Sequence, residues 1–166
     1  YTFGSLTRPL IPAEQERLGG EREWGVLAQD VMGSSLRRTR DQRLLVRNTT
    51  FYSQKLARVP ERVRAHAAAE HRRALAARFP ELAALPFEHT WAGLMGMSGN
   101  LRPFFGELAP GLVAAGGYHG AGISFGTAAG RLLADLAAGE ESEDLAAIRA
   151  LPGPRWIPPE PFLGLG

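Results

Sequence analysis

The chain contains no cysteine. This absence excludes disulfide bonds, thiolate metal sites and cysteine nucleophiles from the segment. The chain also has no apolar run long enough to cross a bilayer and nothing that resembles a signal peptide, so we expect no membrane partner and a cytoplasmic location. No metal site is predicted, because His66, His71 and His89 do not form a metal-ligand constellation with neighbouring acids.

Lysine is almost absent, since Lys55 is the sole lysine and nearly all basic residues are arginine. The formal net charge is nevertheless only +2. The basic residues alternate with acids and lack interleaved aromatics, which is typical of a solvated surface. We therefore predict no nucleic-acid partner.

The apolar fraction of 45% and the charged fraction of 22% are those of a soluble globular protein. A length of 166 residues suits one domain or pieces of two. The chain begins without Met at Tyr1-Thr2-Phe3-Gly4, which reads as the interior of a strand. We therefore expect a part of a longer polypeptide. The sequence carries no signal for an oligomeric state.

Hydrophobic periodicity, turn residues and helix propensity predict a fold of the α+β class. Strands are expected over 1–6, 24–31, 87–97 and 112–115 and in a hairpin of 35–40 with 43–47, and helices over 12–18, 61–79, about 122–136 and 142–151, before an extended proline-rich tail. Pro60 favours the start of the long helix, because proline suits a first helical position. Gly139 is a natural end for the glycine-rich helix.

The most informative segment is a glycine-rich turn between a strand and a helix, with the sequence Gly116-Gly117-Tyr118-His119-Gly120-Ala121-Gly122-Ile123-Ser124-Phe125-Gly126. A helix N-terminus carries unpaired N–H donors and partial positive charge, so it suits a phosphate, a carboxylate or an electron-rich ring. Gly122, Gly126 and Gly130 share one helix face. Because glycine in a helix costs about 1 kcal/mol relative to alanine, this face predicts a close neighbour.

A phosphate cradle is a poor match for this segment. A dinucleotide fingerprint needs an acidic residue on a following strand, whereas here the helix is followed by the proline-rich tail. The Lys-Ser/Thr pair of a P-loop is absent too. The residues alone leave open a packing turn that binds no ligand.

Four motifs occur in an order that resembles a known family: Trp91-Ala92-Gly93-Leu94, Asn100-Leu101-Arg102-Pro103-Phe104-Phe105-Gly106, Gly117-Tyr118-His119-Gly120-Ala121-Gly122-Ile123 and Gly130-Arg131-Leu132-Leu133-Ala134-Asp135-Leu136. They are similar to the C-terminal half of FAD-dependent oxidoreductases of the D-amino-acid oxidase class. Within that class they are most similar to gamma-glutamylputrescine oxidase-like amine oxidases. The resemblance covers nearly the whole chain.

The resemblance implies an antiparallel-sheet portion of a substrate domain over 1–88, the closing strand–helix segment of an FAD-binding domain over 89–140, and a short helix with a proline-rich tail over 141–166. The N-terminal dinucleotide-binding half, which would hold the pyrophosphate of FAD, is the implied missing partner. The family places the glycine turn against the flavin, which assigns cofactor contacts to Gly117, Tyr118, His119, Gly120, Ala121, Gly122, Ile123 and Ser124.

Two departures from the family bear on the substrate. Glycine-oxidase-type enzymes carry arginines, which grip the substrate carboxylate, at the positions of Met95 and Gly120. Without them a buried carboxylate lacks a bidentate partner, so a small amine is favoured over a plain α-amino acid. Trp91 and Met95 are expected to line an apolar slot.

His119 and Tyr52 complete the candidate pocket residues. We expect His119 to shape the pocket or bond locally, because hydride transfer from a neutral amine needs no essential protein base. The predicted activity is oxidation of an amine C–N bond, with FAD as the cofactor. Two alternatives remain: an amino-acid oxidase or dehydrogenase of the same family, and an inactive fragment with only a structural or assembly role.

Overall fold

The computed structural model describes residues 1–30, 33–51, 59–158 and 162, and the predicted pocket residue Tyr52 lies outside them. The chain divides into two compact units, Tyr1–Leu94 and Met95–Gly166. Both combine antiparallel strands with helices, which confirms the predicted α+β class. The division falls six residues after the predicted boundary at 88/89.

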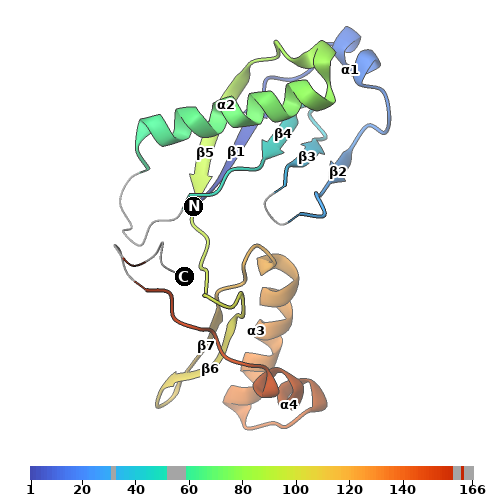
Figure 1. The fold of residues 1–166 in the computed structure, drawn as a ribbon. Coiled ribbons are helices and arrows are strands. Elements are labelled where there is room, and N and C mark those ends of the chain that lie inside the picture. Colours follow the sequence, from blue (N-terminus) through green and yellow to red (C-terminus); the bar gives the residue numbers. More distant parts are fainter. Residues whose placement is uncertain (31–32, 52–58, 159–161, 163–166) are drawn as a thin grey trace. The chain divides into compact units, whose positions relative to one another are not determined.

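The first unit is built on a five-stranded antiparallel sheet with the order β2-β3-β4-β1-β5 (Figure 1). Its strands are β1 (Thr2–Thr7), β2 (Trp24–Val26), β3 (Ser35–Arg38), β4 (Leu44–Arg47) and β5 (Phe87–Gly93). The central strand β1 joins two segments that are far apart in the sequence, because Ser5 pairs with Val46 on one side and with Thr90 on the other. The predicted hairpin of β3 and β4 is confirmed.

Helix α2 (Glu61–Arg78) packs across β1, β4 and β5 (Figure 1). It begins directly after Pro60 and ends one residue before the predicted end. Phe79 precedes a proline, which disfavours helical backbone at Phe79, and its φ of −133° is extended. The short helix α1 (Pro12–Leu18) and the 3₁₀ turn Pro80–Leu82 complete the unit.

The two faces of this sheet differ, because side chains alternate along each strand. The helix face meets α2 and holds the hydrophobic core, which consists of Leu10, Leu36, Leu44, Val46, Leu75, Leu82 and Leu85. We call the other side the open face. Its strand residues include Thr2, Gly4, Leu6, Gly25, Ser35, Arg37, Leu45, Arg47, His89, Trp91 and Gly93. Within the described part of this unit, no helix packs across the open face.

The second unit consists of a β-hairpin and two helices. Its hairpin joins β6 (Phe104–Ala109) to β7 (Leu112–Gly116), and its helices are α3 (Gly122–Ala138) and α4 (Glu143–Ala150). Helix α3 packs on β7, and α4 contacts both α3 and β6. Gly139 ends α3 in the left-handed conformation, as predicted, and Ser142 caps α4 by accepting the N–H of Leu145 at 3.1 Å.

Two predicted strands are too long. The segment predicted over 24–31 is a strand only over Trp24–Val26, and the one predicted over 87–97 ends at Gly93. Both stop where the partner strand begins, since Val26 pairs with Leu36 next to the start of β3 and Gly93 pairs with Thr2. Beyond the end of its partner, an extended segment has no neighbouring strand with which to form backbone hydrogen bonds.

Among the described residues, no helix is both long enough and apolar enough to cross a membrane.

A buried histidine lies between α2 and the sheet. His71 is fully buried, and its Nδ1 lies 2.7 Å from the hydroxyl of Ser5, which also lies 2.8 Å from the hydroxyl of Thr90. His71 Nε2 has no hydrogen-bond partner among the described residues. Burial disfavours the charged imidazolium and lowers the pKa of His71 to about 4, although the nearby Glu70 opposes the shift.

We predict that the chain loses stability as the pH falls from about 6.5 to about 4. The unfolded state, with a histidine pKa of about 6.5, binds a proton in this window that the folded state does not. The full effect is about 3 kcal/mol, since one pKa unit corresponds to about 1.4 kcal/mol. Urea unfolding at pH 7 and pH 5 measures the part that develops above pH 5, about 2 kcal/mol, for the wild type and for His71→Gln, which keeps a neutral polar group. His66→Gln, at an exposed site on the same helix, is the control. An unchanged pH dependence in His71→Gln would contradict the assignment.

Candidate functional site

The glycine-rich turn reverses the chain between β7 and α3. Three of its residues have positive φ: Gly117 at 71°, His119 at 50° and Gly120 at 92°. Glycine adopts this region without a steric penalty, whereas histidine does so only rarely. The N–H of Ala121 donates to the carbonyl of Tyr118 at 2.8 Å and closes the turn. The turn is therefore a defined structure that depends on glycine at two positions.

The first turn of α3 offers free backbone donors. Its N-cap residue, Ala121, makes no side-chain cap. The N–H groups of Gly122, Ile123 and Ser124 have no intrahelical acceptors, and they carry the partial positive charge of the helix N-terminus. The side chain of Ile123 is 92% exposed. This end of the helix combines unpaired donors with an apolar surface, which suits a flat, electron-rich ring.

The aromatic ring of Tyr118 lies close to α3 and accounts for the absence of a side chain at two of the three helix glycines. A Cβ atom at Gly126 would lie 3.3 Å from that ring, and one at Gly122 would lie 3.6 Å from it. Tyr118 also packs against Phe125, with the ring centroids 5.4 Å apart. Gly130, by contrast, has nothing within 4 Å of its Cβ position. The predicted close neighbour of this helix face is thus, at two positions, the chain's own tyrosine.

His119 is held from both sides of its ring. Its Nε2 lies 3.3 Å from the hydroxyl of Ser98, and its Nδ1 lies 3.4 Å from the sulfur of Met97. Ser98 is buried, donates to the carbonyl of Arg102 at 2.8 Å and accepts the N–H of Arg102 at 3.0 Å. These contacts fix the orientation of the imidazole.

The two positions that depart from the family lie side by side. A Cβ atom at Gly120 would be 3.8 Å from the sulfur of Met95. The two positions at which the resemblance to glycine-oxidase-type enzymes predicts arginine are therefore neighbours within the second unit. Together they present a thioether and bare backbone and offer no guanidinium.

The turn at Ser98–Asn100 anchors the proline-rich tail, a function that the sequence analysis missed. Asn100 donates its amide N–H to the carbonyl of Gly153 at 2.9 Å and accepts the N–H of Arg155 at 2.9 Å. Gly99 donates to the carbonyl of Arg155 at 2.9 Å. An asparagine beside glycine near a turn was the available signal, but its partners lie more than 50 residues away in the sequence.

Trp91 belongs to the first unit. It lies on β5, is 42% exposed, and places its ring directly above Gly4. The structure brings together Met95, His119 and the residues of the glycine turn in the second unit.

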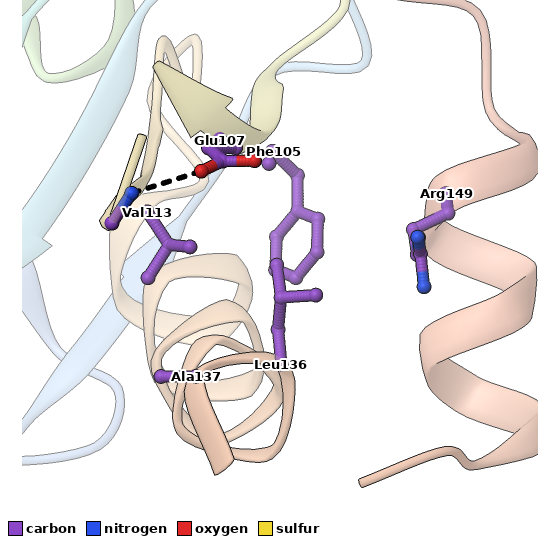
Figure 2. Close-up of a pocket in the computed structure, with 8 residues that line it drawn as sticks. Phe105, Glu107, Val113, Leu136, Ala137 and Arg149 are labelled. Carbon is purple, nitrogen blue, oxygen red and sulfur yellow. Dashed lines mark hydrogen bonds between the residues drawn. The ribbon is translucent and has the colours of Figure 1, made fainter. Parts of the chain in front are cut away.

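A cavity of about 520 Å³ lies at the other end of α3 (Figure 2). Its lining mixes apolar side chains, among them Phe105, Val113 and Leu136, with polar and charged groups. Of its charged residues, Glu107 accepts the N–H of Gly111 at 2.9 Å and Arg149 lies 3.4 Å from Glu141. Both charged groups are engaged in local structure, so the cavity has no convergent set of polar groups and is a poorer candidate than the turn.

The packing of Tyr118 can be tested through the helix glycines. Gly130→Ala should stabilise the chain by about 1 kcal/mol through helix propensity. Gly126→Ala should gain less, because its methyl group meets the ring of Tyr118 at 3.3 Å. In a Tyr118→Ala background the two substitutions should gain equally, as measured by a double-mutant cycle in urea. Equal gains in the presence of Tyr118 would show that the ring does not pack there.

Comparison with known proteins places this turn in a family. The model of the family described as FAD dependent oxidoreductase matches residues 5–136, which include the whole glycine turn. The probable oxidoreductase OrdL of Rhizobium meliloti (strain 1021) is 35% identical over 107 residues, which are 64% of this chain and 23% of that protein. A protein of the same description from Haemophilus influenzae is 35% identical over 63 residues, which are 38% of this chain and 15% of that protein.

The fold is also similar to a solved structure. The crystal structure of iminodiacetate oxidase (IdaA) from Chelativorans sp. BNC1 matches 93% of this chain and 39% of that chain, with a TM-score of 0.65 and 23% identity. The chain thus spans about a quarter or less of the curated relatives and well under half of the structural neighbour. The match over 5–136 confirms the predicted family and its cofactor: the chain belongs to the FAD-dependent oxidoreductases of the D-amino-acid oxidase class.

Proposed function

We propose that this chain is the C-terminal portion of a flavoenzyme that oxidises the C–N bond of a small amine. FAD, when bound, would accept the hydride from the carbon next to nitrogen, and water would then hydrolyse the resulting imine. The observation that carries the proposal is the uncapped first turn of α3 in a chain of an FAD-dependent family.

The role of the turn follows from its charge. The unpaired N–H groups of Gly122, Ile123 and Ser124 would face the pyrimidine edge of the flavin ring. That edge gains negative charge on reduction, so preorganised donors there favour hydride transfer. The exposed side chain of Ile123 would contact the flat ring system. Gly117 to Ser124 would thus hold the ring end of FAD, and the pyrophosphate would bind the N-terminal half of the parent protein.

The substrate class rests on the neighbours Met95 and Gly120. A carboxylate placed there would lose its hydration without gaining a bidentate partner, which is costly. An amine without an α-carboxylate avoids that cost, and the thioether of Met95 suits its apolar part. An amino-acid oxidase that grips the carboxylate from elsewhere is the second candidate, since the structural neighbour is named an iminodiacetate oxidase.

The isolated chain would be incomplete as an enzyme. It contains no glycine fingerprint for a pyrophosphate. We propose that an N-terminal dinucleotide-binding half of the same polypeptide completes the site. The alternative, a folded fragment with only a structural role, predicts no flavin in any form of the protein.

Flavin content tests the proposed function directly. The protein encoded by the full reading frame should purify yellow, with an absorbance band near ~450 nm. Anaerobic addition of amines should bleach that band, and plain α-amino acids should bleach it far more slowly. The chain expressed alone should bind FAD weakly or not at all. A full-length protein without flavin would overturn the proposal.

The substitution Met95→Arg tests the substrate assignment. An arginine beside Gly120 should raise kcat/KM for a plain α-amino acid by about tenfold or more, because a charge-assisted bond contributes about 1.5–3 kcal/mol. The kcat/KM for the matching amine should fall. Leu108→Arg, at an exposed site of the same unit, is the control for added charge. A wild-type enzyme that already prefers α-amino acids would contradict the assignment of an amine substrate, which rests on Met95.

A further inference from the structure

The hydroxyl of Ser98 determines which nitrogen of the His119 ring carries a proton. A serine hydroxyl has one proton to donate. Here that proton has two acceptors, the carbonyl of Arg102 at 2.8 Å and Oδ1 of Asn100 at 3.2 Å. The same oxygen lies 3.3 Å from Nε2 of His119. Because the shorter contact to Arg102 has the ordinary length of an O–H···O bond and takes the proton, the oxygen can only accept from His119, and Nε2 must donate.

The other nitrogen of the ring is then an acceptor. In the neutral tautomer with the proton on Nε2, the lone pair lies on Nδ1. Nδ1 faces the thioether sulfur of Met97 at 3.4 Å. That sulfur has no proton to donate, so the contact joins two electron-rich atoms. No described residue supplies a proton to either atom of this pair.

The pair of acceptors adjoins the position that the proposed function assigns to the substrate. The side chains of His119 and Met97 are both partly exposed, and Gly120 follows His119 directly. A Cβ atom at Gly120 would lie 3.8 Å from the sulfur of Met95. The backbone of His119 has a φ of 50°, a region that residues other than glycine rarely adopt, and the buried Ser98 holds its ring there. All of these residues belong to the second unit.

The side chains at this end of the turn offer acceptors and no donors. Nδ1 of His119 and the sulfur atoms of Met95 and Met97 carry lone pairs only. The group that complements them is an N–H. A primary or secondary amine has at least one N–H on the nitrogen next to the carbon that is oxidised, whereas a neutral tertiary amine has none. An N–H accepted by a ring whose orientation is fixed would also fix the orientation of the C–N bond.

We infer that Nδ1 of His119 accepts an N–H of the amine substrate, with the sulfur of Met97 beside it as a weaker acceptor. Ser98 is a positioning residue in this arrangement, because it holds the proton of His119 on Nε2. The inference rests on the function proposed above, and it narrows the substrate class to primary and secondary amines.

The position of the proton can be measured on the chain itself, without flavin. Heteronuclear NMR of the imidazole nitrogens at about pH 8 separates protonated from unprotonated ring nitrogens. His119 should show a protonated Nε2 and an unprotonated Nδ1, with no detectable population of the other tautomer. A wild-type chain with the proton on Nδ1 would contradict the inference.

Three variants test whether Ser98 sets this tautomer. Ser98→Ala should produce a detectable population with the proton on Nδ1, because the N–H of that form can bond to the sulfur of Met97. Ser98→Thr keeps the hydroxyl and should keep the wild-type tautomer. Thr127→Ala removes an exposed hydroxyl from the same unit and should leave the spectrum of His119 unchanged. A tautomer that is the same in Ser98→Ala as in the wild type would show that Ser98 does not position the ring.

Substrate preference is the readout in the full-length flavoenzyme. N-methylbutylamine and N,N-dimethylbutylamine share one stem and differ by a single N–H. The secondary amine should reduce the flavin with a kcat/KM about tenfold higher, which is the effect of one hydrogen bond. His119→Gly removes the acceptor and suits the positive φ, so it should lower kcat/KM for the secondary amine about tenfold and leave that for the tertiary amine unchanged. Met97→Leu should reduce the preference by a smaller factor, because a thioether is a weak acceptor.

The outcomes separate this inference from the proposed function. A merely structural role of His119 would lower kcat/KM for both amines equally. A flavoenzyme that oxidises both amines equally well, or whose preference survives His119→Gly, would overturn the inference and leave the proposed function standing. A full-length protein without flavin would overturn the proposed function and the amine contact with it. The NMR measurement needs no flavin, so it tests the role of Ser98 in either case.

Discussion

The organisation of the first unit depends on one constraint: a single long helix covers only one face of the sheet. Leu75 on α2 joins the strand leucines and Val46 in one core, and each fully buried aliphatic side chain contributes about 1.5–3 kcal/mol. The alternation of side chains then forces every second strand residue to the opposite side. Among the described residues, no helix packs across that side of the sheet. The open face is thus a direct consequence of where α2 packs.

The candidate site in the second unit presents backbone N–H groups rather than side chains. Left-handed residues at Gly117, His119 and Gly120 turn the chain so that the first N–H groups of α3 remain unpaired. Tyr118 folds back onto Gly122 and Gly126 and fixes the helix against its own turn. The buried hydroxyl of Ser98 holds His119, and the adjoining Asn100 holds the tail. The segments from 97 to 102, 117 to 126 and 153 to 155 therefore form one connected support for the donors of α3.

Local signals in the sequence determined much of the fold. Pro60, Gly139 and the turn between β3 and β4 mark ends that depend only on neighbouring residues, and the structure has them where they were predicted. The ordered motifs likewise determined the family and its cofactor. Only the tertiary structure decided where β2 and β5 end, because a strand stops where its partner begins. It also decided that Tyr118 covers two glycines, that Met95 adjoins Gly120 and that Gly4 admits the ring of Trp91. These contacts join residues whose spacing carries no periodic signal, so packing in three dimensions alone brings them together.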